Sequence, residues 1–112
     1  MSDQSKTLQL FQGETLELDF TWQNEDAVPF DLAGYTAELL LFPQDVTTPI
    51  VYAGTALGGN VSPNITFEVE PVDTAALAAG LHEARIRMTS AGGKVYILPD
   101  NGHLNIRVKE LV

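Results

Sequence analysis

The chain has 112 residues and no cysteine, and its formal net charge at pH 7 is −9. This length suits a single domain, residues 1–112, with its own hydrophobic core, and the missing cysteines exclude disulfides and thiolate metal sites. No stretch approaches the roughly 20 apolar residues that a membrane-spanning helix needs, and the N-terminus lacks a cationic, apolar export signal. We therefore expect no membrane insertion.

The charge is unevenly distributed along the chain. Residues 1–84 contain thirteen acidic residues and one basic residue, whereas residues 85–112 contain two acidic and five basic residues. The acidic majority disfavours nucleic acid as a partner, because a polyanion would be repelled. Two interpretations of the basic segment stay open. Its cations either pair with acids on neighbouring strands or dock on an acidic partner or a second copy, so Arg85, Arg87 and Arg107 are candidate interface residues.

Apolar and polar residues alternate with a period of two in most of the sequence, which is typical of strands with one buried face. In chain order the alternating segments are TLQLF, ETLELDFTW, ITFEVE, HEARIRM, KVYIL and HLNIRVK, with a weaker strand at PIVYAG. The glycine-rich SAGG between two of them predicts a hairpin. The sequence thus predicts six or seven strands.

The segment FDLAGYTAELLLF, residues 30–42, is apolar without this alternation. A proline ends it before a helix of ordinary length could form, so we predict a central strand that is covered on both faces. The face that carries Leu40 and Phe42 then needs a cover, either another chain or the loop TTPIVYAG. We take these two residues, with Ile50 and Tyr52 from that loop, as candidate interface residues.

One segment, VDTAALAAG, has a helical rather than a β pattern. Alanine favours helices and glycine is common just beyond a helix end, so we predict a short helix near residues 73–79 that joins two strands. Leu77 is expected to close the bottom of the core. Alternating strands with one crossover helix predict an all-β, immunoglobulin-like antiparallel sandwich of about seven strands. Residues 43–63, rich in glycine and proline, are expected to be the least regular part.

Residues that could support catalysis form no recognisable motif. His82 and His103 are each predicted at an exposed strand start, and neither belongs to a metal-ligand spacing. Paired acids such as Glu17 and Asp19 alternate outward, so we expect them to stay solvated rather than to act in acid–base chemistry. The sequence therefore predicts a protein that is not an enzyme and that has no metal and no cofactor.

Aromatic side chains are the remaining candidates for a binding site, namely Trp22, Tyr35, Tyr52 and Tyr96. A tryptophan that ends an alternating strand is more often a core residue, whereas a tyrosine in an irregular stretch suits an interface. If Trp22 or Tyr52 instead presents a stacking platform, the alternative function is a carbohydrate- or receptor-binding sandwich module.

Three features recur in order over nearly the whole chain: QGET before a strand that ends in tryptophan, DLAGYTAEL, and DTAALAAGLHEARI before a glycine hairpin. In these features the chain resembles small β-sandwich domains of tailed bacteriophages, in particular the N-terminal domain of baseplate upper proteins, with relatives among tail, fibre and head-decoration proteins. The resemblance implies a non-catalytic structural protein of the virion, made in the host cytoplasm. It also implies attachment to capsid, tail or baseplate proteins, as a homo-oligomer or in many copies.

The chain departs from the family pattern in two respects. His82 stands where the family commonly has an aromatic residue, often tyrosine. Baseplate proteins of this type usually continue beyond the sandwich, whereas this sequence stops at Val112. We therefore expect a free-standing adaptor or decoration subunit.

Overall fold

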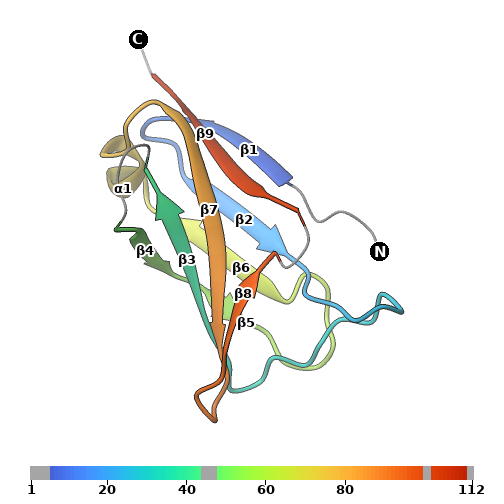
Figure 1. Cartoon of the computed structure of the whole chain (residues 1–112). Helices are drawn as coiled ribbons and strands as arrows, with labels where there is room; N and C mark the ends of the chain where they lie inside the picture. The colour runs from blue at the N-terminus through green and yellow to red at the C-terminus, as the bar shows by residue number, and fades with distance from the viewer. Residues whose placement is uncertain (1–5, 44–47, 100–101, 111–112) are drawn as a thin grey trace.

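The computed structural model describes residues 6–43, 48–99 and 102–110. These residues form nine strands and one short helix (Figure 1). The elements are β1 (Lys6–Phe11), β2 (Leu16–Phe20), β3 (Thr36–Phe42), β4 (Ile50–Ala53), β5 (Thr55–Ala56), β6 (Ile65–Val69), α1 (Pro71–Ala75), β7 (Gly80–Thr89), β8 (Val95–Leu98) and β9 (Leu104–Lys109).

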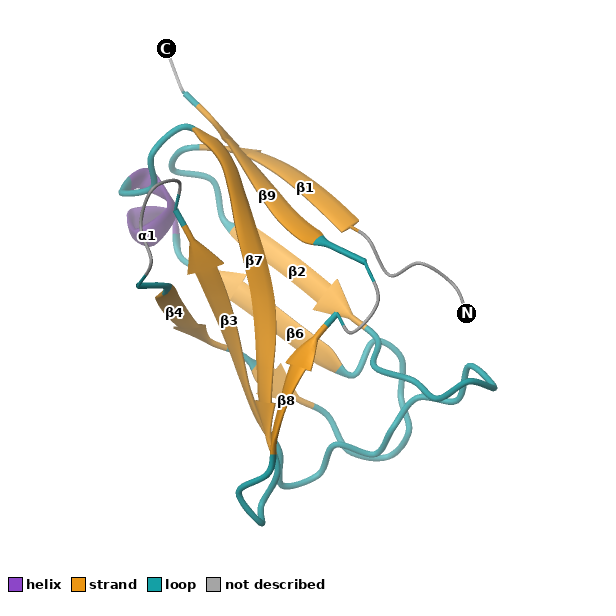
Figure 2. Ribbon diagram, in the orientation of Figure 1, coloured by secondary structure: helices purple, strands orange, loops and turns teal. Residues whose placement is uncertain are grey.

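The strands form two stacked sheets (Figure 2). The larger sheet has the order β1-β9-β7-β3-β4, with β8 also pairing with β7, and the smaller sheet has the order β2-β6-β5. The strand pairs are antiparallel except for β1 with β9. One edge of the ten-residue β7 pairs with β3, and along its other edge the first half pairs with β9 and the second half with β8. The predicted all-β sandwich is confirmed, with nine strands in the described residues rather than about seven.

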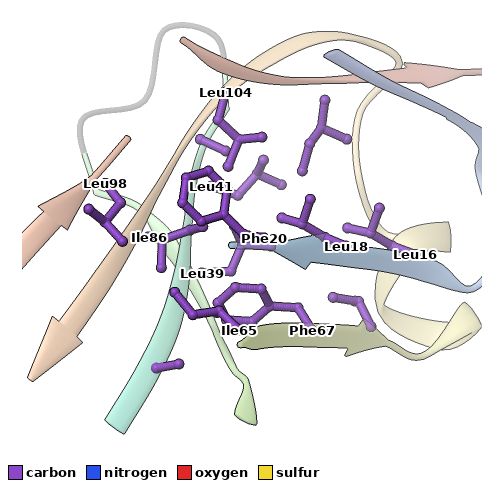
Figure 3. Close-up of a cluster of buried hydrophobic side chains, with 14 of the residues drawn as sticks. Leu16, Leu18, Phe20, Leu39, Leu41, Ile65, Phe67, Ile86, Leu98 and Leu104 are labelled. Atoms are coloured by element: carbon purple, nitrogen blue, oxygen red, sulfur yellow. The ribbon is translucent and has the colours of Figure 1, made fainter. Parts of the chain in front are cut away.

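The core lies between the sheets and is built from the alternating residues that the sequence indicates (Figure 3). In β2 the apolar residues are buried and the polar residues between them are exposed, and in β6 and β9 buried apolar residues likewise alternate with partly or fully exposed polar ones. Side chains of β2 and β6 meet those of β3, β7, β8 and β9 in this layer. Burying each leucine or isoleucine contributes about 1.5–3 kcal/mol relative to an exposed position.

The prediction of a central strand at AELLLF is confirmed. β3 lies between β7 and β4, and Leu39 and Leu41 point into the core without exposure. Leu40 belongs to the outer face of the sheet and is nevertheless only 6% exposed. Its direct cross-strand neighbours are Arg85 of β7 and Val51 of β4.

The predicted short crossover helix is confirmed, although it spans Pro71–Ala75 and so lies earlier in the chain than the expected residues 73–79. α1 begins at Pro71, whose fixed φ angle suits a first helical position, and it ends at Ala75. The hydroxyl of buried Thr74 donates to the carbonyl oxygen of Glu14 at 2.6 Å, which ties the helix to the loop before β2. Leu77 then turns into the core as predicted, with 3% exposure.

Within the segment 43–63, β4 confirms the weaker strand predicted at PIVYAG, and the two-residue β5 was not predicted. Residues 44–47 lie outside the described part. The chain passes from the larger sheet to the smaller one at Gly54, whose amide donates to the carbonyl oxygen of Ala37 at 2.9 Å. A Cβ atom at Gly54 would lie 2.2 Å from the ring of Phe67 and 2.8 Å from the carbonyl oxygen of Thr66. Only glycine fits where the two sheets come this close.

Replacing this glycine should therefore destabilise the fold. We expect Gly54→Ala to lower the free energy of unfolding by about 1–3 kcal/mol, because the Phe67 ring must move out of a packed core. Gly92→Ala is the matched control, since the nearest atom to its added Cβ would be the Ser90 hydroxyl at 3.9 Å. The control should change stability by less than about 0.5 kcal/mol in urea denaturation. Equal effects of the two substitutions would contradict this account of the sheet crossing.

Candidate binding site

The apolar residues predicted at an interface do not form one strip. Ile50 and Tyr52 of β4 are paired with Leu41 and Leu39, so they share the core-facing side of the sheet, whereas Leu40 and Phe42 lie on the outer side. The expectation of an uncovered strip fails at Leu40, which is buried, and Phe42 is half-buried.

Tyr52 packs against the edge of the core instead of standing free. Burial raises the pKa of its hydroxyl above the ordinary value, and the negative charge of Asp73 adds to the effect. The large apolar side chains of β4 that are exposed are Ile50, at 38%, and Val51, at 46%.

The predicted basic residues fall into two groups. The Arg87 guanidinium bonds the Glu38 carboxylate across β3 and β7 at 2.8 Å, and Arg85 pairs with Glu83 on its own strand at 2.6 Å. Arg87 therefore follows the first interpretation of the basic segment, in which a cation pairs with an acid on a neighbouring strand, whereas the acidic partner of Arg85 lies on the same strand. Arg107 is exposed on β9, and no ion pair to it is found within the described residues.

The prediction of an exposed His82 is wrong. The ring lies on the core side of β7, is 2% exposed, and has its Nε2 atom 2.7 Å from the carbonyl oxygen of Ala78. A histidine here fills the inward position that alternation assigns to that residue, and its polar edge bonds the chain leaving α1. His103 is exposed, as predicted. Within the described ranges, no three acidic or histidine side chains are grouped closely enough to hold a metal ion.

Four aromatic rings gather at one end of the sandwich and line a cleft of about 210 Å³. Trp22 is central: its ring centroid lies 5.1 Å from that of Phe30, 5.9 Å from that of Tyr35 and 5.2 Å from that of Tyr96. Phe30 and Tyr96 are each 38% exposed, and the carboxylate-bearing Asp31 completes the lining. We call these five residues the aromatic cleft.

The topology brings these residues together from distant parts of the chain. Trp22 follows the end of β2, Tyr35 precedes β3, Phe30 and Asp31 belong to the loop between those strands, and Tyr96 lies in β8. The loops that join β2 to β3 and β5 to β6 lie at the same end of the sandwich (Figure 2). Sequence reasoning named three of the rings as candidates but missed Phe30 and Asp31. The one sequence signal for this site was that several aromatic residues lie close to strand ends. In an antiparallel sandwich, such strand ends can lie together at one end of the domain.

The buried amide of Asn64 bonds the backbone of two residues that line the cleft. Its Oδ1 accepts the backbone N–H of Trp22 at 2.8 Å, and its Nδ2 donates to the carbonyl oxygens of Trp22 and Phe30 at 2.9 and 3.1 Å. Asn64 has no exposed surface, so all three bonds form away from water. One side chain thus fixes the backbone of two cleft residues.

Asp31 is held by the two loops that it connects. Its Oδ1 accepts the backbone N–H groups of Ala33 and Gly59 at 3.1 and 3.0 Å. These two hydrogen bonds lower the pKa of the Asp31 carboxyl below its ordinary value of 3.8. The cleft therefore presents a fixed negative charge beside its aromatic rings at neutral pH.

Comparison of the chain with models of known protein families and with curated protein sequences gives no match in either case. In the described part of the chain, no helix is long and apolar enough to cross a membrane. The candidate site consequently rests on its own geometry, which provides aromatic surface and one carboxylate for binding.

Removing the Asn64 amide should loosen the cleft. Asn64→Ala leaves the Trp22 N–H and the Phe30 carbonyl oxygen without their partner, whereas the Trp22 carbonyl oxygen still accepts the Phe30 N–H, so we expect a loss of about 2–4 kcal/mol in unfolding free energy and a red shift of Trp22 fluorescence. Gln23→Ala, an exposed side chain next to Trp22, serves as the control and should leave both quantities nearly unchanged. We call the three side-chain hydrogen bonds of Asn64 the Asn64 clamp. An unshifted Trp22 emission spectrum in Asn64→Ala would contradict the role of this clamp in fixing the cleft.

The Asp31 hydrogen bonds should make stability depend on pH. Because the folded-state pKa is depressed, the stabilisation is present above the ordinary value of 3.8 that applies to the unfolded chain, and it is lost as pH falls through the folded-state pKa. Urea denaturation of wild type and Asp31→Asn should therefore differ most at neutral pH and converge as the solution is acidified. Asp26→Asn controls for the change in net charge. A gap that stays constant down to about pH 2 would refute the assignment.

Proposed function

We propose that this chain is a non-catalytic attachment module of a tailed-phage virion, which binds capsid, tail or baseplate proteins through protein–protein contacts. Two observations support the proposal: the resemblance of its ordered segments to phage sandwich domains, and an unprotected strand at one edge of the larger sheet. The module acts in the virion, in several copies.

The edge strand β4 carries the proposal. It ends the larger sheet, and its sequence IVYA has no charged residue. Proteins ordinarily protect such an edge with charged or polar side chains, as β1 does at the opposite edge with exposed Lys6, Thr7 and Gln9. The side chains of Ile50 and Val51 at the β4 edge are instead apolar and exposed. Such an edge suits pairing with a further strand.

The occupant that we propose is an extended segment of another virion protein. Backbone hydrogen bonds to β4 would supply affinity, and the exposed side chains of Ile50 and Val51 would supply apolar contact on the two faces. The outer face beside this edge is already closed, because Leu40 is buried and Arg87 is paired with Glu38. Contact is therefore concentrated on the edge rather than spread over the sheet.

The alternative function, a carbohydrate-binding module with a stacking platform, has less support. Tyr52 packs against the core, and the three rings around Trp22 stand at 54–84° to the indole plane. A sugar platform needs an open, flat ring, and neither side chain offers one.

A charge placed on the edge should abolish attachment without harming the fold. We expect Val51→Lys to weaken binding to virion particles stripped of the protein by at least about tenfold, because a lysine on an edge strand opposes strand addition. Stability should change by less than about 0.5 kcal/mol. Val28→Lys is the matched control, since both valines are 46% exposed. Sedimentation of protein with particles and light scattering of the protein alone measure the two outcomes.

Two results would overturn the proposal. The first is failure of the wild-type protein to bind any virion component. The second is equal loss of binding in both lysine variants, which would mean that added charge, rather than the β4 edge, is responsible. Self-association that Val51→Lys abolishes would instead assign the edge to a second copy of the chain.

A further inference from the structure

The rings of the aromatic cleft are not stacked in parallel but surround a small cavity. Phe30 stands at 65° to Trp22, Tyr35 at 84° and Tyr96 at 54°, with centroids between 5.1 and 5.9 Å from the indole. A hydrophobic core closes such gaps, yet here two of the rings are more than one-third exposed and a cavity of about 210 Å³ opens between them. The hollow is smaller than the roughly 300–1,000 Å³ typical of drug-sized ligands. It suits one side-chain head group.

The electrostatic character of the aromatic cleft is negative. Each ring presents a negative π face, and cations are attracted when they lie within about 6 Å of a ring centroid. Asp31 adds a full negative charge, which its bonds to Ala33 and Gly59 hold in place. Among the described residues, no cationic group lines the cleft to neutralise it.

We propose that the aromatic cleft receives a cationic side chain, an arginine or lysine, from the protein to which this module attaches. This inference rests on the proposed attachment function and adds a second contact site to it. A planar guanidinium can lie against a ring while it donates to the Asp31 carboxylate, so arginine is the better occupant. The binding loops need no rearrangement, because the Asn64 clamp and the Asp31 bonds already fix them.

Trp22 makes the proposal directly measurable, since it is the only tryptophan in the chain. Its fluorescence is followed during titration with acetyl-Gly-Arg-Gly-amide, and separately with the neutral acetyl-Gly-Gln-Gly-amide and with methyl β-glucoside. We expect a saturable change in fluorescence with the arginine peptide at millimolar concentrations, about 1–10 mM. The affinity should be weak because a single cation gains binding free energy from only a few contacts with the rings. The glutamine peptide should bind at least about tenfold more weakly, and added salt should weaken only the arginine peptide.

Substitutions separate the charge of the cleft from its rings. Asp31→Asn keeps an Oδ1 acceptor for the loop but removes the negative charge, and should weaken arginine-peptide binding about three- to tenfold. Asp26→Asn makes the same charge change outside the cleft and should leave binding unaltered. Tyr96→Leu keeps apolar volume but removes a π face, so it should also weaken binding. Circular dichroism and the unfolding midpoint establish that each variant remains folded.

Three outcomes would overturn the cleft proposal: equal binding of the arginine and glutamine peptides, tighter binding of the glucoside, or unchanged arginine-peptide binding in both Asp31→Asn and Tyr96→Leu. The titration does not involve β4, so the two proposals can fail separately. If the protein attaches to particles but does not bind the peptide, the proposal for the cleft is wrong. If it binds the peptide but does not attach to particles, the proposed virion role is wrong.

Discussion

The structure depends on one constraint, that the alternating apolar side chains of nearly every strand must be sealed between two sheets. The smaller sheet has three strands and the larger has six, so the smaller cannot cover the whole inner face of its partner. At the β8 end the loops supply the missing cover, because Trp22 packs on Tyr96, whose strand neighbour Met88 is fully buried. Rings on loops do not close this end as tightly as a further strand would. The aromatic cleft is the consequence of that unequal layering.

The two places where the chain crosses from one sheet to the other impose further requirements on the residues that stand there. At Gly54 the two layers approach so closely that no side chain fits, and on the other crossing Pro71 and Thr74 fix a single helical turn against the loop before β2. At these positions we expect a side chain of different size or shape to be poorly tolerated. The residues that contact solvent at β4 and in the loops are free of this restriction, which leaves them available for recognition.

The alternating segments and the non-alternating β3 could be predicted from the sequence because successive side chains of a strand point to opposite faces. The contacts that these residues make with residues of other strands and loops could not be predicted. The hydrogen bond that accommodates the buried His82 ring depends on a carbonyl acceptor at Ala78, and the burial of Leu40 depends on which strands flank it. The cleft is the clearest case. Trp22, Tyr35 and Tyr96 were visible as aromatic residues, but their meeting with Asp31 depends on loop geometry that the buried Asn64 determines.

The β4 edge and the aromatic cleft would contribute differently to attachment. A four-residue edge offers few backbone hydrogen bonds, each worth about 0.5–1.5 kcal/mol net, and an exposed ion pair adds about 0–1 kcal/mol. Either contact alone gives weak binding, but two contacts on one rigid body share a single loss of translational freedom. In this proposal the edge would pair with any extended backbone, whereas the cleft would discriminate by charge. Specific attachment would therefore require a partner that presents both an extended strand and a cation at the matching separation.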